Sequence, residues 1–252
     1  MRKIVDGIIF YNELKMLKFR FTELYNVVDY FIVVECSHTY AGNEKEFYFE
    51  KNKNDFEEFK DKIIHIKVND PPNTENAWDN ENYQRRCIDR GIQQLNLEKD
   101  DLIIIADCDE IPKRETLEKL KQDGIENSMF ALEMDMYYYN LECRQEKPWT
   151  LTRILSYEKY QEKNDSHVPR HIPCPIISNA GWHFSYFGDV NFIKNKIKNF
   201  AHQEYNNKIF LQDDKIKNMI DNAEDLFYRM KKFKKVKIED NDNLPHNYKL
   251  LL

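Results

Sequence analysis

Glycine is scarce in this chain: its 252 residues include only six, at positions 7, 42, 91, 124, 181 and 188. No two of them form a G-x-G-x-x-G fingerprint, and no Gly-Lys-Ser or Gly-Lys-Thr step closes a Walker loop. Both motifs need glycine so that backbone amides can approach a phosphate closely. If the protein handles phosphates, we therefore expect side chains and a metal ion to hold them.

The five cysteines, at positions 36, 87, 108, 143 and 174, form no framework either. No two of them have the spacing of a zinc site, and Asp6 and Glu13 interrupt the apolar stretch that an export signal would need. We therefore expect reduced cysteines and a cytoplasmic protein. The longest aliphatic runs, such as 102–106, are only long enough for a strand, so the sequence predicts no membrane span.

Positive charge is not in excess. The chain has 44 Asp and Glu against 38 Lys and Arg, for a formal net charge of −6. This balance argues against a broad nucleic-acid-binding surface. Because 41% of the residues are hydrophobic, the chain can fill one core, and a single domain is the first expectation.

The first half of the chain alternates between strand-like and helix-like segments. Residues 3–10 are β-branched and aromatic, and Asn12 then precedes apolar residues at helical spacing from Leu14 to Leu24. Further strands are predicted at 27–35, 63–68 and 102–106, with a helix at about 80–96. This alternation predicts a largely parallel sheet with the wholly apolar strand 102–106 near its centre.

The second half is less regular. The pattern predicts a short helix over about 114–122 and an aromatic-rich strand over about 128–139. Four prolines punctuate 140–180, which we interpret as hairpins and loops over one end of the sheet. Helical patterning returns near 189, and 207–237 is predicted to be a charged helix.

The strongest local signal is the acidic sequence Asp107-Cys108-Asp109-Glu110, directly after the central strand. Ligands of open α/β sheets bind beyond the carboxyl ends of the strands, so a site is expected here. In an extended segment Asp107 and Asp109 point the same way, and converging carboxylates repel each other unless a cation lies between them. Oxygen ligands suit Mg²⁺ or Mn²⁺. An acidic turn that caps the next helix is the plainer alternative.

An Asp-x-Asp after an apolar strand also occurs in phosphatases of the haloacid dehalogenase type. There the motif normally lies near the start of the domain and is followed by Thr or Val, whereas here it lies in mid-chain and Ile111 follows. The later pair Asp213-Asp214, which such an enzyme would need for its metal, does not end an apolar strand. A metal-dependent phosphatase therefore stays only as an alternative.

Several blocks of the sequence resemble, in order, the motifs of glycosyltransferase family 17. They are DGIIFYNELKMLKFRFTELYNVVDYFIVVE (6–35), QRR (84–86), ADCDEIP (106–112), YYYN (137–140), GWHFSYFG (181–188) and AHQEYN (201–206). The resemblance covers about residues 4–206. It implies a GT-A-type α/β fold with a mixed, mostly parallel sheet flanked by helices, a nucleotide-sugar donor, a divalent metal and inversion at the anomeric carbon.

On this interpretation, residues 1–206 form a GT-A catalytic domain and 207–252 a helical C-terminal extension packed on it. The resemblance implies a metal-dependent inverting glycosyltransferase that moves a sugar from a UDP-sugar to a hydroxyl of a glycan or glycoconjugate. N-acetylglucosamine is the first candidate for that sugar. A non-catalytic module that binds nucleotide sugars or glycans on the same fold is the alternative, and the oligomeric state is left open.

The resemblance also implies roles for individual residues. The metal ligands would be Asp107 and Asp109, with His183 or His202 added because many GT-A enzymes use a later histidine. The donor would contact Arg85, Asp107 and, at the ends of the first two strands, Phe10, Asn12 and Glu35. The plainer alternatives are an ion pair of Arg85 with Glu81 or Asp89, and a capping role for Glu35.

An inverting transfer also needs a general base that takes the proton of the acceptor hydroxyl. Glu204 is the first candidate, before Asp135 and Glu110, and a base that is none of these stays open. For the acceptor we select Trp182, Tyr138 and Tyr186, because aromatic side chains beside polar groups suit sugar rings. Core packing is the alternative for each aromatic residue.

The segment 229–237 is basic, with Phe233 and Val236 between its cations. The cations are Arg229, Lys231, Lys232, Lys234, Lys235 and Lys237. Such a run can hold a protein weakly on an anionic membrane surface. A solvated helix face is the simpler explanation.

Overall fold

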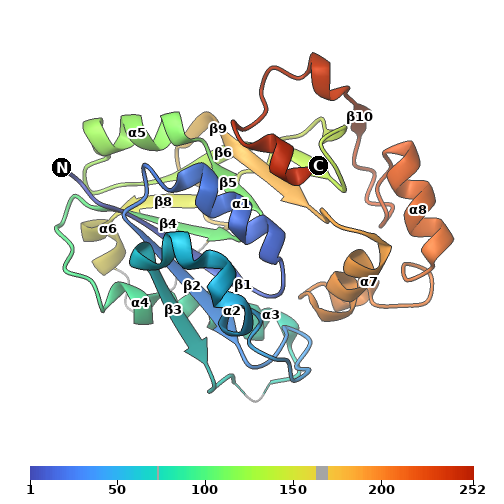
Figure 1. Ribbon diagram of the computed structural model, residues 1–252, viewed down its shortest axis with the longest axis horizontal. Helices are drawn as coiled ribbons and strands as arrows, with labels where there is room; N and C mark the ends of the chain where they lie inside the picture. Colours follow the sequence, from blue (N-terminus) through green and yellow to red (C-terminus); the bar gives the residue numbers. More distant parts are fainter. Residues whose placement is uncertain (73, 163–169) are drawn as a thin grey trace.

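A mixed sheet forms the centre of the computed structural model, which describes residues 1–72, 74–162 and 170–252. Its ten strands lie mainly in the order β10-β7-β6-β8-β4-β1-β2-β3, and β9 pairs with both β5 and β6. Helices flank the sheet (Figure 1). Within the described ranges, no helix combines the length and the apolar character needed to cross a membrane.

The first half of the chain forms the parallel part of the sheet. Its strands are β1 (Ile4–Phe10), β2 (Tyr30–Cys36), β3 (Ile63–Val68) and β4 (Leu102–Asp107), and β1 pairs in parallel with β2 and β4, as β2 does with β3. The connecting helices are α1 (Leu14–Leu24), α2 (Tyr48–Asn52), the 3₁₀ segment Lys53–Lys62, α3 (Ala77–Arg86) and α4 (Asp89–Ile92). The four predicted strands are confirmed, although the second begins three residues later than expected.

The second half adds mainly antiparallel pairs. Its elements are β5 (Glu110–Pro112), α5 (Arg114–Asp123), β6 (Met129–Tyr138), β7 (Cys143–Gln145), β8 (Arg153–Ser156), α6 (Tyr157–Gln161), β9 (Ile176–Ser185), α7 (Val190–Asn199), α8 (Asp213–Asn222) and β10 (Phe233–Lys235). Only β6 and β9 pair in parallel among them. The hairpin-like stretch predicted at 140–180 contains β7 and β8 and the start of β9. The predicted α/β class, a mixed sheet flanked by helices, is confirmed.

Two predicted helices are shorter than expected. The helix predicted at 80–96 is split into α3 and α4 around Cys87, whose N–H bonds to the carbonyls of both Tyr83 and Gln84. The charged helix predicted at 207–237 is restricted to α8, because β10 joins the sheet by antiparallel pairing with β7. The C-terminal extension is therefore only partly helical, and its proposed boundary at residue 206 stays a prediction.

The sheet separates two hydrophobic clusters. Along β4, Ile104 faces the cluster beneath α1, while Ile103 and Ile105 face the cluster beneath α4 and α6. Residues Leu102 to Ala106 are therefore all buried, which explains why this strand has no polar alternation. β4 also has a partner on each side, β1 and β8, and this confirms its predicted place within the sheet.

Close packing brings the α3–α4 region against β1. A Cβ atom on Gly7 would lie 2.5 Å from Cγ2 of Ile88 and 3.2 Å from the carbonyl oxygen of Ile104. Glycine on β1 therefore allows these helices to approach the sheet more closely than any larger residue would. This approach helps to place Arg85, at the end of α3, near the end of β4.

The C-terminal segment folds back onto α1 (Figure 1). The Glu23 carboxylate accepts hydrogen bonds from the backbone N–H groups of His246 and Asn247, at 3.2 and 3.1 Å. The Asn247 side chain donates a third bond to the same carboxylate at 2.8 Å. These contacts fix the outer side of α1, the helix that also reaches into the site described below.

Substitution of Gly181 by Ala should lower the free energy of unfolding by about 1–3 kcal/mol. A Cβ atom at this position would lie 2.4 Å from the carbonyl oxygen of Ile111, so β5 and β9 could not keep their present pairing. Urea unfolding measures the change, with exposed Ser178→Ala on the same strand as the control. Equal stability of the two variants would contradict this explanation.

Candidate active site

The acidic sequence forms a tight turn beyond the carboxyl end of β4. Asp107 is the last residue of β4 and Glu110 the first of β5, while Cys108 and Asp109 form the turn between them. The sequence analysis treated this segment as extended, but residues 108 and 109 form a turn. Asp107 and Asp109 nevertheless both line one cavity of about 720 Å³, at the edge of the sheet where the sequence predicts a site.

A buried ion pair supports this turn from below. Arg20 of α1 donates through Nε and Nη2 to the two carboxylate oxygens of Asp6 on β1, at 2.7 and 2.6 Å, and both side chains are fully buried. Its Nη1 donates to the carbonyl oxygens of Asp107 and Glu110, at 3.1 and 2.5 Å. One guanidinium thus joins α1, β1 and both ends of the turn.

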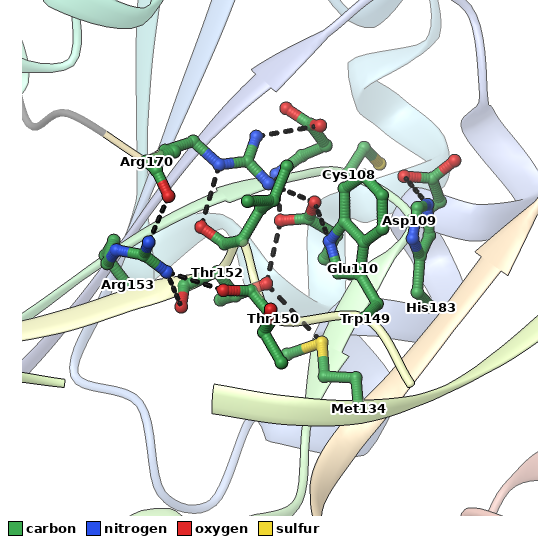
Figure 2. A network of polar contacts seen from close by, with 12 residues as sticks. Cys108, Asp109, Glu110, Met134, Trp149, Thr150, Thr152, Arg153, Arg170 and His183 are labelled. Atoms are coloured by element: carbon green, nitrogen blue, oxygen red, sulfur yellow. Dashed lines mark hydrogen bonds and ion pairs between the residues drawn. The ribbon is translucent and has the colours of Figure 1, made fainter. Parts of the chain in front are cut away.

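Glu110 is part of the support of the turn and does not face the cavity. Its carboxylate accepts hydrogen bonds from Trp149 Nε1 at 2.7 Å and Thr152 Oγ1 at 2.8 Å, and it forms an ion pair with Arg170 (Figure 2). The backbone N–H of Asp107 donates to it as well, at 3.0 Å. Because the carboxylate is fully buried and its oxygens are occupied, the prediction of Glu110 as general base is wrong.

Two arginines hold Asp107. Arg85 Nη1 lies 2.7 Å from one carboxylate oxygen and Arg170 Nη1 lies 2.9 Å from the other. Burial alone would raise the pKa of Asp107, but the two guanidinium groups outweigh it and hold this pKa far below its usual range. Arg85 also pairs with Glu81 at 2.8 Å, so the plainer ion pair occurs. Arg85 lines the cavity as well, and its contact with a donor stays a prediction.

Asp109 has a separate set of partners. Lys196 Nζ of α7 lies 2.8 Å from one carboxylate oxygen, and His183 Nε2 of β9 lies 3.4 Å from the other. Figure 2 shows the imidazole of His183 beside this carboxylate. Burial opposes ionisation of Asp109, but Lys196 and His183 keep its pKa well below the usual value. Asp109 is therefore ionised at neutral pH.

The donor atoms for a metal are fewer than the sequence predicted. Within the described part of the chain, no group of three or more His, Cys, Asp and Glu side chains could hold an ion. Asp107 faces two arginines, and His202 contacts Glu204 at 2.7 Å and the ring of Trp78 at 4.6 Å. Asp109 and His183 remain as an oxygen and a nitrogen donor side by side, which fits a cation whose other ligands are waters and substrate oxygens.

Glu35 and Phe10, predicted to contact the donor, lie away from the cavity. The fully buried Glu35 carboxylate accepts from the backbone N–H of Phe49 at 3.0 Å and lies 3.1 Å from His65 Nε2. Phe10 packs in the core against Phe49. These two predictions are wrong because the strand ends are covered by α2, whereas Asn12 lines a second cavity of about 530 Å³.

Of the three aromatic residues selected for the acceptor, two line the larger cavity and one lies in the core. Trp182 is buried in the core and donates to the carbonyl oxygen of Asn243 at 2.6 Å, so its selection was wrong. Alternation along β9 directs His183 and Ser185 to the larger cavity and Trp182 to the opposite side. Tyr138 and Tyr186 do line that cavity, and their contact with an acceptor stays a prediction.

The two other predicted bases also lie apart from the turn. Asp135 of β6 is bound by Arg144 and Asn243, at 2.6 and 2.7 Å, on the face of the strand opposite the cavity-lining Met136. The prediction of Asp135 as the general base is therefore wrong. Glu204 lies in the exposed 3₁₀ turn Gln203–Tyr205 and pairs with His202, which lines the cavity. Its role as a base stays a prediction.

The phosphatase alternative loses its second acidic pair. Asp213 and Asp214 begin α8, and Asp213 pairs with Lys194 at 2.5 Å. Neither residue shares the cavity with Asp107. The acidic pair that such a metal site requires is therefore in the wrong part of the fold.

Four residues of the site were missed from the sequence. They are Glu13, Arg170 and Lys196, which line the larger cavity, and Arg20 beneath the turn. The two cavities share Glu13, Asp109, Tyr186 and Lys196, and thus meet at the acidic turn. Only Glu13 had a signal, because it lies in the segment just after the first strand, where sites of parallel sheets form.

Removal of the Arg20 side chain should be strongly destabilising. Arg20→Met leaves Asp6 buried without its cation, and we expect a loss of about 3–5 kcal/mol in urea unfolding. The control is Arg90→Met, which breaks the exposed pair with Asp70 and should cost no more than about 1 kcal/mol. Adding Asp6→Asn to Arg20→Met should recover part of the loss, and a fully additive double variant would contradict a direct pair.

A comparison of the sequence with known families shows the class of protein to which this chain belongs. The profile of glycosyltransferase family 17 matches residues 1–236, and the chain therefore belongs to that family. Its relatives include the β-1,4-mannosyl-glycoprotein 4-β-N-acetylglucosaminyltransferases of Rattus norvegicus and Homo sapiens, each 31% identical over 156 residues. The match covers 60% of this chain and 29% of each relative, so the chain corresponds to only part of those enzymes.

Solved structures with a similar arrangement are more distant. S. aureus TarS 1–349 shares 13% sequence identity at a TM-score of 0.38, with 79% of this chain and 66% of that chain covered. The mannosyltransferase PcManGT from Pyrobaculum calidifontis, in complex with GDP-Man and Mn²⁺, shares 10% identity at a TM-score of 0.43 over 75% and 56%. Membership of the family, and not these likenesses, carries the functional conclusion.

Proposed function

We propose that this protein transfers a sugar from a UDP-sugar to a hydroxyl of a glycan or glycoconjugate, with inversion at the anomeric carbon. The observation that carries the proposal is the pair of Asp109 and His183 at the wall of a cavity of about 720 Å³, in a chain of family 17. N-acetylglucosamine is the first candidate for the sugar, since the curated relatives are named for its transfer. The uridine diphosphate follows from the family resemblance.

Asp109 and His183 are the residues that would hold Mn²⁺ or Mg²⁺. Such an ion, when bound, stabilises the negative charge that develops on the departing diphosphate. The chain contributes further positive charge of its own, because Arg85, Arg170 and Lys196 line the same cavity. The planar guanidinium groups suit phosphate oxygens, and Arg170 is already fixed by Asp107 and Glu110.

Glu13 is the carboxylate that best fits the general base. The other acidic residues of the cavity, Asp107, Asp109 and Glu81, are each paired with cations, whereas Glu13 has no ion-pair partner within the described ranges. One of its oxygens accepts the backbone N–H groups of Tyr11 and Asn12, at 3.1 and 3.0 Å. These bonds fix the carboxylate and leave its second oxygen for the substrate.

The reaction then has a simple balance. Glu13 takes the proton of the acceptor hydroxyl while the hydroxyl oxygen forms a bond to the anomeric carbon. The bond between that carbon and the diphosphate oxygen breaks, and its electron pair leaves with the nucleotide. The place of Glu13 between the two cavities lets the donor lie in the larger one and the acceptor approach from the smaller one.

Nucleotide binding tests the donor site directly. Calorimetric titration with UDP, UDP-N-acetylglucosamine, UDP-galactose, UDP-glucose and GDP-mannose should show binding of uridine nucleotides in Mn²⁺ that EDTA weakens. Asp109→Asn should weaken it by about tenfold or more, because it removes a charged ligand. Asp214→Asn, at an exposed aspartate of α8, is the control and should bind as the unaltered chain does.

The outcomes separate the alternatives. Binding of no nucleotide in any condition would remove the donor site, and binding without turnover on any acceptor would favour a non-catalytic module. Release of free sugar or inorganic phosphate without an acceptor, at a rate that acceptors do not change, would identify a hydrolase.

Activity measurements test the base. Glu13→Gln should lower kcat by about 10²–10⁴-fold, the usual contribution of a positioned base, while leaving the affinity for UDP nearly unchanged. Glu204→Gln is the comparison, since Glu204 is the base predicted from the sequence. A large loss of kcat in Glu204→Gln with little change in Glu13→Gln would reverse the assignment.

A further inference from the structure

The segment 228–231 turns alternate side chains into and out of the larger cavity. Tyr228 and Met230 have left-handed backbone angles, φ 54° and 58°, and their side chains are 62% and 92% exposed. The residues that alternate with them, Arg229 and Lys231, line the cavity. Left-handed backbone angles and exposed apolar side chains are both unfavourable. We therefore expect a functional reason for a backbone that places the two cations at the cavity.

The two cations meet at one hydroxyl. Lys231 Nζ lies 2.9 Å from the Tyr138 hydroxyl oxygen and Arg229 Nη2 lies 3.1 Å from the same atom. Arg229 is paired with Asp225 at 2.7 Å. Lys231 forms no ion pair with any carboxylate in the described part of the chain. Burial, and then the neighbouring Arg229, lower the pKa of Lys231 to about 8.

We propose that Arg229 and Lys231 form an anion-binding site for a phosphate or carboxylate group of a ligand in the cavity. An anion would supply the countercharge that Lys231 lacks, in a partly buried place where charge-assisted hydrogen bonds are strong. The site lies at the end of β6, which β8 separates from β4 in the sheet. It is therefore on the side of the acidic turn opposite β1 to β3.

This arrangement divides the basic segment that the sequence analysis singled out. Arg229 and Lys231 face the cavity, whereas Lys232, Lys234 and Lys235 are exposed. A peripheral membrane contact could use only the exposed group. The inference deepens the proposed function and rests on it for the ligand, which is either the diphosphate of the donor or a charged group on the acceptor.

The test measures binding of inorganic phosphate and pyrophosphate to the full chain without metal, by calorimetry and by thermal shift. The unaltered chain should bind pyrophosphate, Lys231→Met should weaken it by about tenfold, and Lys231→Arg should keep most of the affinity. The matched control is Lys232→Met, which removes an exposed lysine of the same segment. If the unaltered chain binds neither anion, or if Lys231→Met binds as Lys232→Met does, the proposal is overturned.

Two further arms identify the source of the anion. A weaker affinity of Lys231→Met for UDP, with UMP unaffected, assigns the site to the terminal phosphate of the donor. Weaker phosphate binding in the presence of saturating UDP assigns it to a charged acceptor. Either result supports the site, and no effect in both arms overturns it.

Folding of each variant is checked by circular dichroism, and Lys231→Gln, which can still bond to Tyr138, replaces Lys231→Met if the latter unfolds. Because these readouts need no turnover, the site and the proposed function fail separately. Sugar transfer by a chain whose anion binding does not depend on Lys231 leaves the function and removes the site. Anion binding that depends on Lys231, without sugar transfer to any acceptor, leaves the site and removes the proposed function.

Discussion

The buried pair of Asp6 and Arg20 is the interaction on which the site depends. It lies between β1 and α1, and the free nitrogen of its guanidinium reaches the carbonyl oxygens at both ends of the acidic turn. The backbone of the turn is thus held by a charge that the core itself contains. Compared with well-packed apolar residues of similar volume, such a buried pair adds little net stability, whereas the loss of one partner alone is costly.

Above the turn, each carboxylate has its own cations. Asp107 is neutralised by two guanidinium groups and Asp109 by the ammonium of Lys196, with the imidazole of His183 beside it. The division explains why two acidic residues two positions apart are both ionised at this partly buried turn. It also gives them different roles. Asp107 anchors two arginines that line the cavity, while Asp109 offers a carboxylate oxygen next to a nitrogen donor.

The sequence predicted what depends on local pattern. Apolar runs identified β1 to β4, and the position of Asp107 and Asp109 after the most apolar strand led to the candidate site. The predictions that were wrong concern features that depend on tertiary packing. Whether Trp182 faces a cavity or the core depends on the register of β9, Glu35 is covered by α2, and β10 pairs with β7 some 90 positions earlier in the chain (Phe233 with Gln145). Nothing local distinguishes Lys196 or Arg20 from other cations on amphipathic helices.

The return of the C-terminal segment to α1 has a consequence for the order in which the protein forms. Glu23 and the backbone of His246 are 223 positions apart, and contacts at such a separation form slowly because a long loop must close first. The same helix carries Arg20. During synthesis, α1 can therefore gain these contacts only after residue 247 has left the ribosome.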